Sequence, residues 1–166
     1  MTSHYLDIQV VPDAETSAPP LLSTLYGRLH LALVEQKRDD IGVSFPRYSR
    51  NPRTLGPILR LHSSAAALGA LMSVDWLKGV RGNVRLSEIL PVPADAEHRV
   101  VQRKQFKTNV DRLRRRRMQR KGETEEEAKK AIPSTVERKP DLPYVNLRSG
   151  SNKQNFCLFI QLSTAH

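Results

Sequence analysis

The amino-acid sequence predicts an α+β fold, with an N-terminal ferredoxin-like domain followed by a smaller α/β domain. Two observations lead to this prediction. Strand-like and helix-like patterns follow one another along residues 1–90 in the order β-α-β-β-α-β, which is the order of the ferredoxin-like fold. A proline-containing linker at 91–97 then precedes a second set of elements, among them an arginine-rich helix. We therefore expect one domain over residues 1–92 and a second domain, with the arginine-rich helix, over residues 93–166.

In the first domain, the spacing of apolar residues predicts each element in turn. Polar and apolar residues alternate over 4–11, which predicts a half-buried strand. Leucines recur at helical spacing over 21–36, which predicts a helix that packs on a sheet. The remaining expected elements are strands over 41–46 and 58–62, an amphipathic helix over 63–72 and a strand over 83–90.

The second domain is expected to begin with a strand over 99–107 that leads into the arginine-rich helix, at about 109–121. Thr124 and Glu127 have the spacing of a capping box, so a short helix should begin there and end at Pro133. Two further strands, separated by a polar turn, are expected over 144–148 and 154–160.

The positive charge of the chain is concentrated in one segment. Eleven residues of 99–121 are basic and only Asp111 is acidic, so the segment carries a net charge of +10, equal to that of the whole chain. Its densest part, 112–121, predicts a helix that is cationic on almost every face and lacks an apolar stripe for docking on a core. Nucleic-acid phosphates are the natural partner of such a helix. A solvated basic arm is the alternative, although the segment lies between strand-like sequences.

Other features of the sequence argue against a secreted, a zinc-binding or a membrane-spanning protein. Cys157 is the one cysteine, which excludes an internal disulfide, argues against a cysteine-based zinc site and suits a reducing, cytoplasmic location. The first residues lack the charged start and apolar stretch of a signal peptide. No apolar run approaches the length that spans a membrane, so we expect no membrane partner.

Six segments between residues 4 and 160 together resemble a known family. The arginine-rich segment and the turn with two serines are the most specific of them. The segments are HYLDI at 4–8, LHLALV at 29–34, IGVSFP at 41–46, RLRRRRMQR at 112–120, EEEAKKAIP at 125–133 and NLRSGSNKQNFCLFI at 146–160. The chain thereby resembles the CRISPR-RNA-processing endoribonucleases of type I-F CRISPR systems, which have ferredoxin-like RNA-binding domains.

The resemblance implies an enzyme of antiviral defence that processes RNA. Proteins of this family bind the stem-loop of CRISPR repeat RNA, cut it once at the 3′ base of the stem and leave a 2′,3′-cyclic phosphate. They need no metal or other cofactor, and they stay on the product within the type I-F surveillance complex. We therefore expect repeat RNA and the other subunits of that complex as partners of this chain, which should be a monomer when free.

His30 is the residue that we expect to transfer a proton. It lies four residues after Tyr26, beside the apolar stripe of the helix over 21–36. Spacing alone favours an ordinary packed or solvated histidine. The resemblance places His30 at the position of the family's catalytic histidine, and attack by a ribose 2′-hydroxyl needs a proton acceptor. Whether His30 is general base, general acid or both stays open.

Ser149 and Ser151 belong to the polar turn, where serines are common for backbone capping. The resemblance implies that Ser149 aligns the 2′-hydroxyl, which belongs to the substrate, and Ser151 is kept beside it. Phe156 alternates with Leu158 and Ile160, so a core position is one interpretation. The resemblance favours the other, in which Phe156 stacks on the terminal base pair of the hairpin.

Arg103 and Gln105 are two residues apart on the expected strand, so both side chains should leave the same face. Arginine can bind guanine and glutamine can bind adenine through two hydrogen bonds, and the resemblance implies base reading at these positions. A solvated strand face is the alternative. Gln119 stands where the family has a phosphate-binding arginine. The residues expected to bind RNA from the helix are Arg112, Arg115, Arg116, Gln119 and Arg120.

The chain departs from the family at its end. After the strand over 154–160 the family continues to a further strand and an active-site tyrosine, whereas this chain has the residues 161–166. We therefore expect a sheet edge that is left open. The alternative to an active enzyme is a non-catalytic subunit that binds an RNA stem-loop. A more remote rival is a basic ribosomal-protein-like assembly factor, which would bind RNA without requiring a defined stem-loop.

Overall fold

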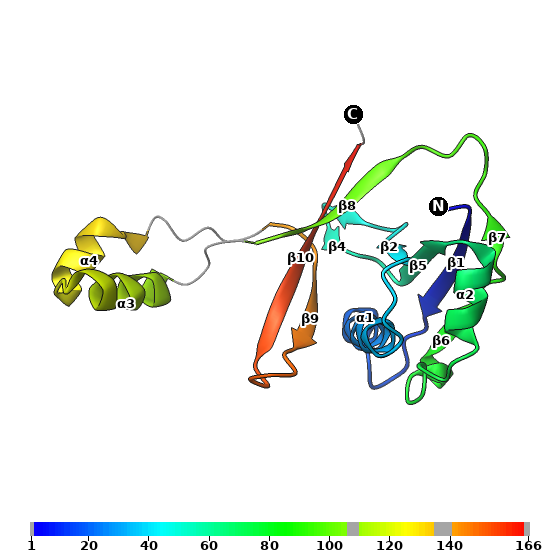
Figure 1. Cartoon of the computed structure of the whole chain (residues 1–166), viewed down its shortest axis with the longest axis horizontal. Coiled ribbons are helices and arrows are strands. Elements are labelled where there is room, and N and C mark those ends of the chain that lie inside the picture. The colour runs from blue at the N-terminus through cyan, green and yellow to red at the C-terminus, as the bar shows by residue number, and fades with distance from the viewer. Residues whose placement is uncertain (1, 106–109, 135–140, 165–166) are drawn as a thin grey trace. The chain divides into compact units, whose positions relative to one another are not determined.

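A computed structural model describes residues 2–105, 110–134 and 141–164 of the protein (Figure 1). The contacts of the chain form two compact units. Unit 1 combines residues 1–103 with 142–166, and unit 2 consists of residues 104–141. The division into domains 1–92 and 93–166 expected from the sequence stays a prediction.

The first sheet of unit 1 has the strand order of a ferredoxin-like fold. Its four main strands are all antiparallel to their neighbours and lie in the order β2 (Gly42–Ser44), β5 (Ile58–Ser63), β1 (His4–Val10) and β6 (Val84–Leu86). Helices α1 (Ala18–Glu35) and α2 (Ala65–Met72) provide the two crossovers. The predicted α+β fold with a ferredoxin-like beginning is therefore confirmed.

Two local predictions were wrong. The strand expected over 83–90 is interrupted: a 3₁₀ turn (Arg81–Asn83) precedes β6, and β7 (Leu90–Pro91) pairs with β1 separately. Between β6 and β7, the Asp7 N–H donates to Ser87 Oγ at 2.8 Å, which replaces a strand hydrogen bond by a side-chain one. The segment between β2 and β5, for which no strand was expected, contains a small hairpin of β3 (Ser49–Arg50) and β4 (Arg53–Thr54).

The core of unit 1 follows from the alternation along its strands. Leu6, Ile8 and Val10 of β1 are buried together with Leu59 and Leu61 of β5. These side chains pack against the apolar faces of α1 and α2, which is where the leucine spacing had predicted a buried stripe. Burial of such side chains is the main favourable term in folding.

The opposite face of the same sheet is polar. Arg60 donates to both carboxylate oxygens of Asp7, at 2.7 and 2.9 Å, and its guanidinium lies 4.5 Å from the ring centre of Tyr5. Ser44 Oγ and His62 Nε2 share a hydrogen bond of 2.6 Å. Burial lowers the pKa of His62, and the charge of Arg60 lowers it further. A neutral His62 can accept a hydrogen bond from the Ser44 hydroxyl, and this hydrogen bond links β2 to β5.

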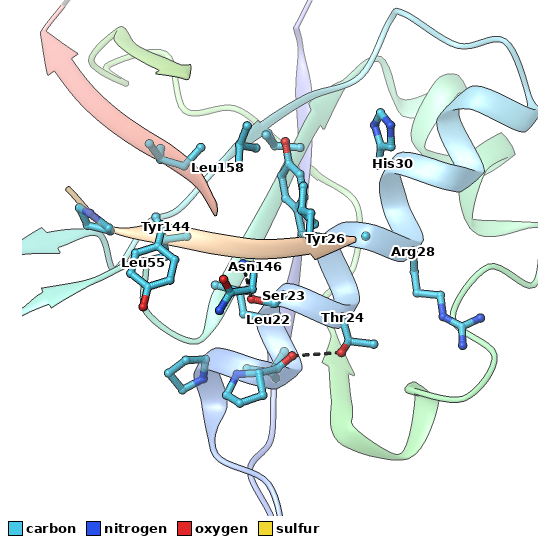
Figure 2. A pocket seen from close by; sticks show the side chains of 18 of the residues that line it. Leu22, Ser23, Thr24, Tyr26, Arg28, His30, Leu55, Tyr144, Asn146 and Leu158 are labelled. Atoms are coloured by element: carbon cyan, nitrogen blue, oxygen red, sulfur yellow. Dashed lines mark hydrogen bonds between the residues drawn. The ribbon is translucent and has the colours of Figure 1, made fainter. Parts of the chain in front are cut away.

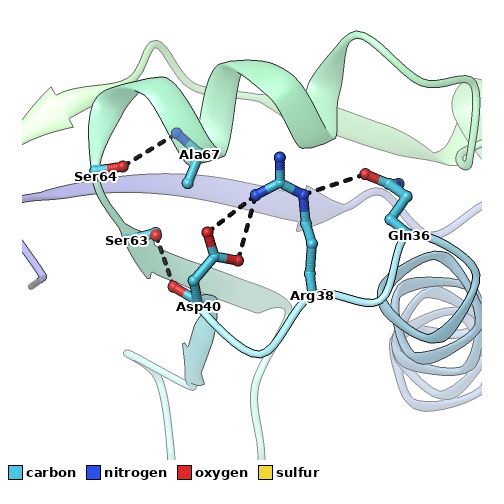
Figure 3. A network of polar contacts seen from close by, with 6 residues as sticks. All are labelled: Gln36, Arg38, Asp40, Ser63, Ser64 and Ala67. Carbon is cyan, nitrogen blue, oxygen red and sulfur yellow. Dashed lines mark hydrogen bonds and ion pairs between the residues drawn. The ribbon is translucent and has the colours of Figure 1, made fainter.

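A network of polar contacts joins the end of α1 to the start of α2 (Figure 3). Arg38 donates to Gln36 Oε1 and to the Asp40 carboxylate, where its closest contact is 3.0 Å. The Ser63 hydroxyl donates to the backbone oxygen of Asp40 at 2.6 Å. Ser64 caps α2 by accepting a hydrogen bond from the Ala67 N–H. The network holds the loop after α1 and thereby the position of β2.

A second sheet of unit 1 has β10 (Asn155–Thr164) between β8 (Arg99–Lys104) and β9 (Tyr144–Arg148). α1 lies between the two sheets (Figure 1). Val145 of β9 belongs to the same core as the leucines of α1. The Asn146 N–H of the edge strand β9 donates to Ser23 Oγ of α1 at 3.0 Å. The open sheet edge expected from the sequence stays a prediction. Residues 106–107 of the strand expected over 99–107 lie outside the described part of the chain.

Unit 2 is a helical hairpin of α3 (Val110–Lys121) and α4 (Glu125–Ala131). The capping box predicted at the start of α4 is confirmed, since both of its hydrogen bonds form. Over 112–121 no side chain is buried, as the prediction of a helix without an apolar stripe requires, while Val110 at the start of α3 and Ala128 of α4 are buried in this unit. Two arginines also hold the hairpin: Arg114 Nε donates to the Ile132 oxygen at 2.9 Å, and Arg117 pairs with the Glu123 carboxylate at 2.7 Å.

Among the described helices, none combines the length and the apolar character needed to cross a membrane.

Candidate functional site

Unit 1 contains an open cavity of about 1930 Å³ along one side of α1. The strands β4, β8, β9 and β10 and the turn at 149–154 contribute to its walls. Four of the residues singled out in the sequence line it together: His30, Arg103, Ser149 and Phe156. The fold therefore brings side chains that are more than a hundred positions apart in the sequence into one site (Figure 2).

His30 reaches the cavity because of the rotation of α1. Leu25 and Leu29 are buried and fix which face of the helix meets the core. Tyr26 and His30, one turn apart, consequently face the same side, as expected for an i, i+4 pair, while Arg28, which also lines the cavity, points in another direction (Figure 2). The His30 side chain is exposed and lines the cavity, where an entering substrate can reach it.

The turn between β9 and β10 places the two serines. The Ser149 N–H donates to the Gln154 oxygen at 2.9 Å, and the Lys153 N–H donates back to the Ser149 oxygen at 3.0 Å. The hydroxyls of Ser149 and Ser151 share a hydrogen bond of 3.1 Å. Ser149 lines the cavity, whereas Ser151 is exposed and connects to the site through Ser149.

Phe156 is on the strand face that packs toward α1, but near the end of that face. Its register partner is Leu147, and the next residues on this face, Leu158 and Ile160, are buried in the core. Phe156 itself remains 38% exposed and lines the cavity. The interpretation of Phe156 as an ordinary core residue was therefore wrong, and its ring is open to a ligand.

Arg103 brings a positive charge to the cavity. Burial raises the pKa of the Tyr26 phenol, and the charge of Arg103 offsets part of that rise. Tyr26 therefore stays a neutral hydroxyl beside His30, with its ring stacked on Phe45 at 6.4 Å between centres. Gln105 is exposed but follows the last residue of β8, so the strand spacing that predicted a face shared with Arg103 does not extend to it.

The polar and charged side chains of α3 that the sequence singled out or the fold uses fall into two groups. Arg114 and Arg117 make the contacts within unit 2 described above. The five residues expected to contact RNA are all exposed: Arg112, Arg115, Arg116, Gln119 and Arg120. Among the residues with a described placement, we find no group of three or more His, Cys, Asp or Glu side chains that could hold a metal ion.

Comparison with known proteins shows the family to which this chain belongs. The family model described as "CRISPR-associated protein (Cas_Csy4)" matches residues 5–166. This chain belongs to the Csy4 family. It is 49% identical to the CRISPR-associated endonuclease Cas6/Csy4 of Pseudomonas aeruginosa (strain UCBPP-PA14) and 42% identical to the protein of the same name from Escherichia coli (strain UTI89 / UPEC). Each match spans 158 residues, which is 95% of this chain and 84% of the relative. The family predicted from the sequence is confirmed.

Several polar and aromatic residues that line this Csy4-family cavity were not singled out in the sequence, among them Tyr26, Arg53 and Tyr144. The position of Tyr26 four residues before His30 was a usable signal, because such residues share a helix face. Arg53 and Tyr144 carried no such signal, since their approach depends on how the β3–β4 hairpin meets β9.

Proposed function

We propose that this chain is an endoribonuclease that binds the stem-loop of CRISPR repeat RNA and cleaves it at the 3′ base of the stem. The observation that carries the proposal is the single cavity lined by His30, Ser149 and Phe156. An exposed proton-transfer group, a hydroxyl held in a turn and an open aromatic ring lie there together. Membership of a family whose relatives are named CRISPR-associated endonucleases supports the same reading.

The chemistry that these groups suit is attack by the ribose 2′-hydroxyl on the adjacent phosphate. The 2′-oxygen forms a bond to phosphorus and loses its proton, and the bond from phosphorus to the 5′-oxygen of the next nucleotide breaks. That oxygen leaves with a proton, so the products are a 2′,3′-cyclic phosphate and a 5′-hydroxyl. His30 transfers one or both of these protons. Ser149, steadied by Ser151, aligns the attacking hydroxyl, which contributes through orientation.

Other residues hold the RNA in this proposal. Phe156 stacks on the base pair at the foot of the stem, and Arg103 and Gln105 read base edges near it. The exposed residues of α3 bind phosphates: Arg112, Arg115, Arg116, Gln119 and Arg120. Because these contacts are all to the stem-loop, the cleaved product leaves slowly and stays bound within a type I-F surveillance complex in this proposal. The free chain is a monomer in the cytoplasm and uses no metal or cofactor in this scheme.

A non-catalytic subunit that binds the same stem-loop is the second candidate. The surroundings of the His30 imidazole favour it, since among the described residues the ring has no hydrogen-bond partner. In many active sites such a partner sets the tautomer and direction of the ring. In our primary proposal, the bound RNA provides that orientation.

The decisive experiment incubates the protein with the repeat hairpin of its own genome in the presence of EDTA. We expect one cut at the 3′ base of the stem and a product that ends in a cyclic phosphate, because proton transfer by His30 needs no metal. Mass spectrometry of the product identifies the end. Tight binding without any cut would favour the non-catalytic subunit, and absence of binding to the hairpin would rule out both.

A further inference from the structure

The strands β9 and β10 have a polar and aromatic face on the side away from the core. Every second residue of β9 points to this side, and the register of the two strands places a residue of β10 opposite each of them. Five of the six residues are exposed and one is half-buried. We call this surface the β9–β10 face, and it consists of Tyr144, Asn146, Arg148, Asn155, Cys157 and Phe159.

Aromatic rings and a guanidinium gather at one end of the β9–β10 face. The rings of Tyr144 and Phe159 lie 5.6 Å apart between centres and are tilted by 59°. The Arg53 guanidinium lies 5.6 Å from the centre of the Tyr144 ring. Tyr144 is nevertheless 40% exposed, so part of its ring is open. The Cys157 thiol donates to Asn146 Oδ1 at 3.2 Å, which fixes the neighbouring amide on the same face.

The same row of residues leads directly into the candidate active site. Tyr144, Asn146 and Arg148 line the cavity that contains His30 and Ser149. Arg148 immediately precedes Ser149, and its Nε donates to the Lys153 oxygen of the serine turn at 3.2 Å. From Tyr144 to Ser149 the strand spans roughly 17 Å at the usual rise per residue. The cavity is therefore longer than one phosphodiester group requires.

We propose that the β9–β10 face binds the unpaired RNA that follows the cleavage site, with Tyr144 stacking on a base. This inference rests on the proposed cleavage at the foot of a stem. If Phe156 covers the last base pair and Ser149 lies at the scissile phosphate, the strand on the 3′ side continues along β9. An open tyrosine with one arginine beside it, Arg53, and another further along the strand, Arg148, suits the binding of a single strand without sequence preference, because every base can stack and every linkage carries a negative charge.

The test measures the affinity of three RNAs that carry a 2′-deoxyribose at the cut site. One is the hairpin alone, one has unpaired nucleotides on its 3′ side and one has them on its 5′ side. We expect the 3′ extension to strengthen binding by wild type about tenfold, the size of one base–aromatic stacking contact. Tyr144→Ala should lose this gain and bind the bare hairpin as wild type does, whereas Tyr144→Phe should keep it.

A second measurement does not depend on any variant. A 2-aminopurine placed as the first nucleotide after the cut site should lose fluorescence when wild type binds, because its base stacks. No gain from the 3′ extension, an equal gain in Tyr144→Ala, or a gain from the 5′ extension alone would overturn the inference. Tight binding of the bare hairpin with any of these results leaves the proposed function intact. Failure to bind the bare hairpin would defeat both.

Discussion

His30→Ala is expected to lower the single-turnover rate of repeat-hairpin cleavage by about a hundred- to ten-thousandfold, the usual contribution of a general acid–base group. Binding of the hairpin should remain close to that of wild type. The reason is that His30 transfers a proton in the transition state and contributes little to the phosphate contacts of the ground state. Rates at saturating protein and the affinity of an uncleavable hairpin measure the two effects separately.

His98→Ala provides the matched control for this prediction. His98 is exposed, as His30 is, but it lies outside the cavity. The control should cut at the wild-type rate, which excludes a general effect of removing an imidazole. Equal rates for His30→Ala and wild type would show that the active site has been assigned to the wrong residue.

Hairpin affinity is expected to fall roughly a thousandfold between 50 and 200 mM salt, as it does when six or more phosphates are neutralised. The exposed cationic side chains of α3 are the source of this dependence, since each phosphate contact releases a bound counterion. Binding titrations at several salt concentrations give the slope. A shallow slope, or equal affinity for duplex DNA, would contradict the assignment of α3 to the RNA interface.

Two substitutions that each remove one positive charge from unit 2 sharpen this measurement. Arg115 is exposed on α3, so Arg115→Ala should reduce the salt slope by about one. Lys129 on α4 pairs with Glu125 at 3.3 Å, and Lys129→Ala should leave the slope unchanged. If both variants reduced the slope equally, the net charge of the unit rather than the surface of α3 would be responsible.

Much of the fold could be predicted because local patterns reflect local burial. The leucines of α1 lie one turn apart, so their spacing also set the face on which His30 emerges. The capping box at Thr124 needs only residues within one turn and was equally visible. The interruption between β6 and β7 was not, because it depends on the contact of Ser87 with Asp7, a residue eighty positions away.

The site itself was only partly visible in the sequence. His30 and Ser149 were found through resemblance, and no local pattern indicated that they would share a cavity. Arginines 114 and 117 looked like the other cations of α3, yet they bind Ile132 and Glu123 and hold the helical hairpin. The sequence alone does not distinguish an arginine that stabilises the fold from one that faces solvent, because the difference depends on which residues lie near it in space. The approach of Arg53 to Tyr144 depends in the same way on segments that are far apart in the sequence.

In the proposed reaction, the cavity beside α1 positions a ribose 2′-hydroxyl for attack on the adjacent phosphate. The most direct test replaces a single 2′-hydroxyl, that of the nucleotide before the scissile phosphate, by hydrogen. We expect wild type to bind this RNA as tightly as the natural hairpin and not to cut it. Cleavage of the substituted RNA at the natural rate would rule out the proposed reaction, because the nucleophile would then have to come from elsewhere.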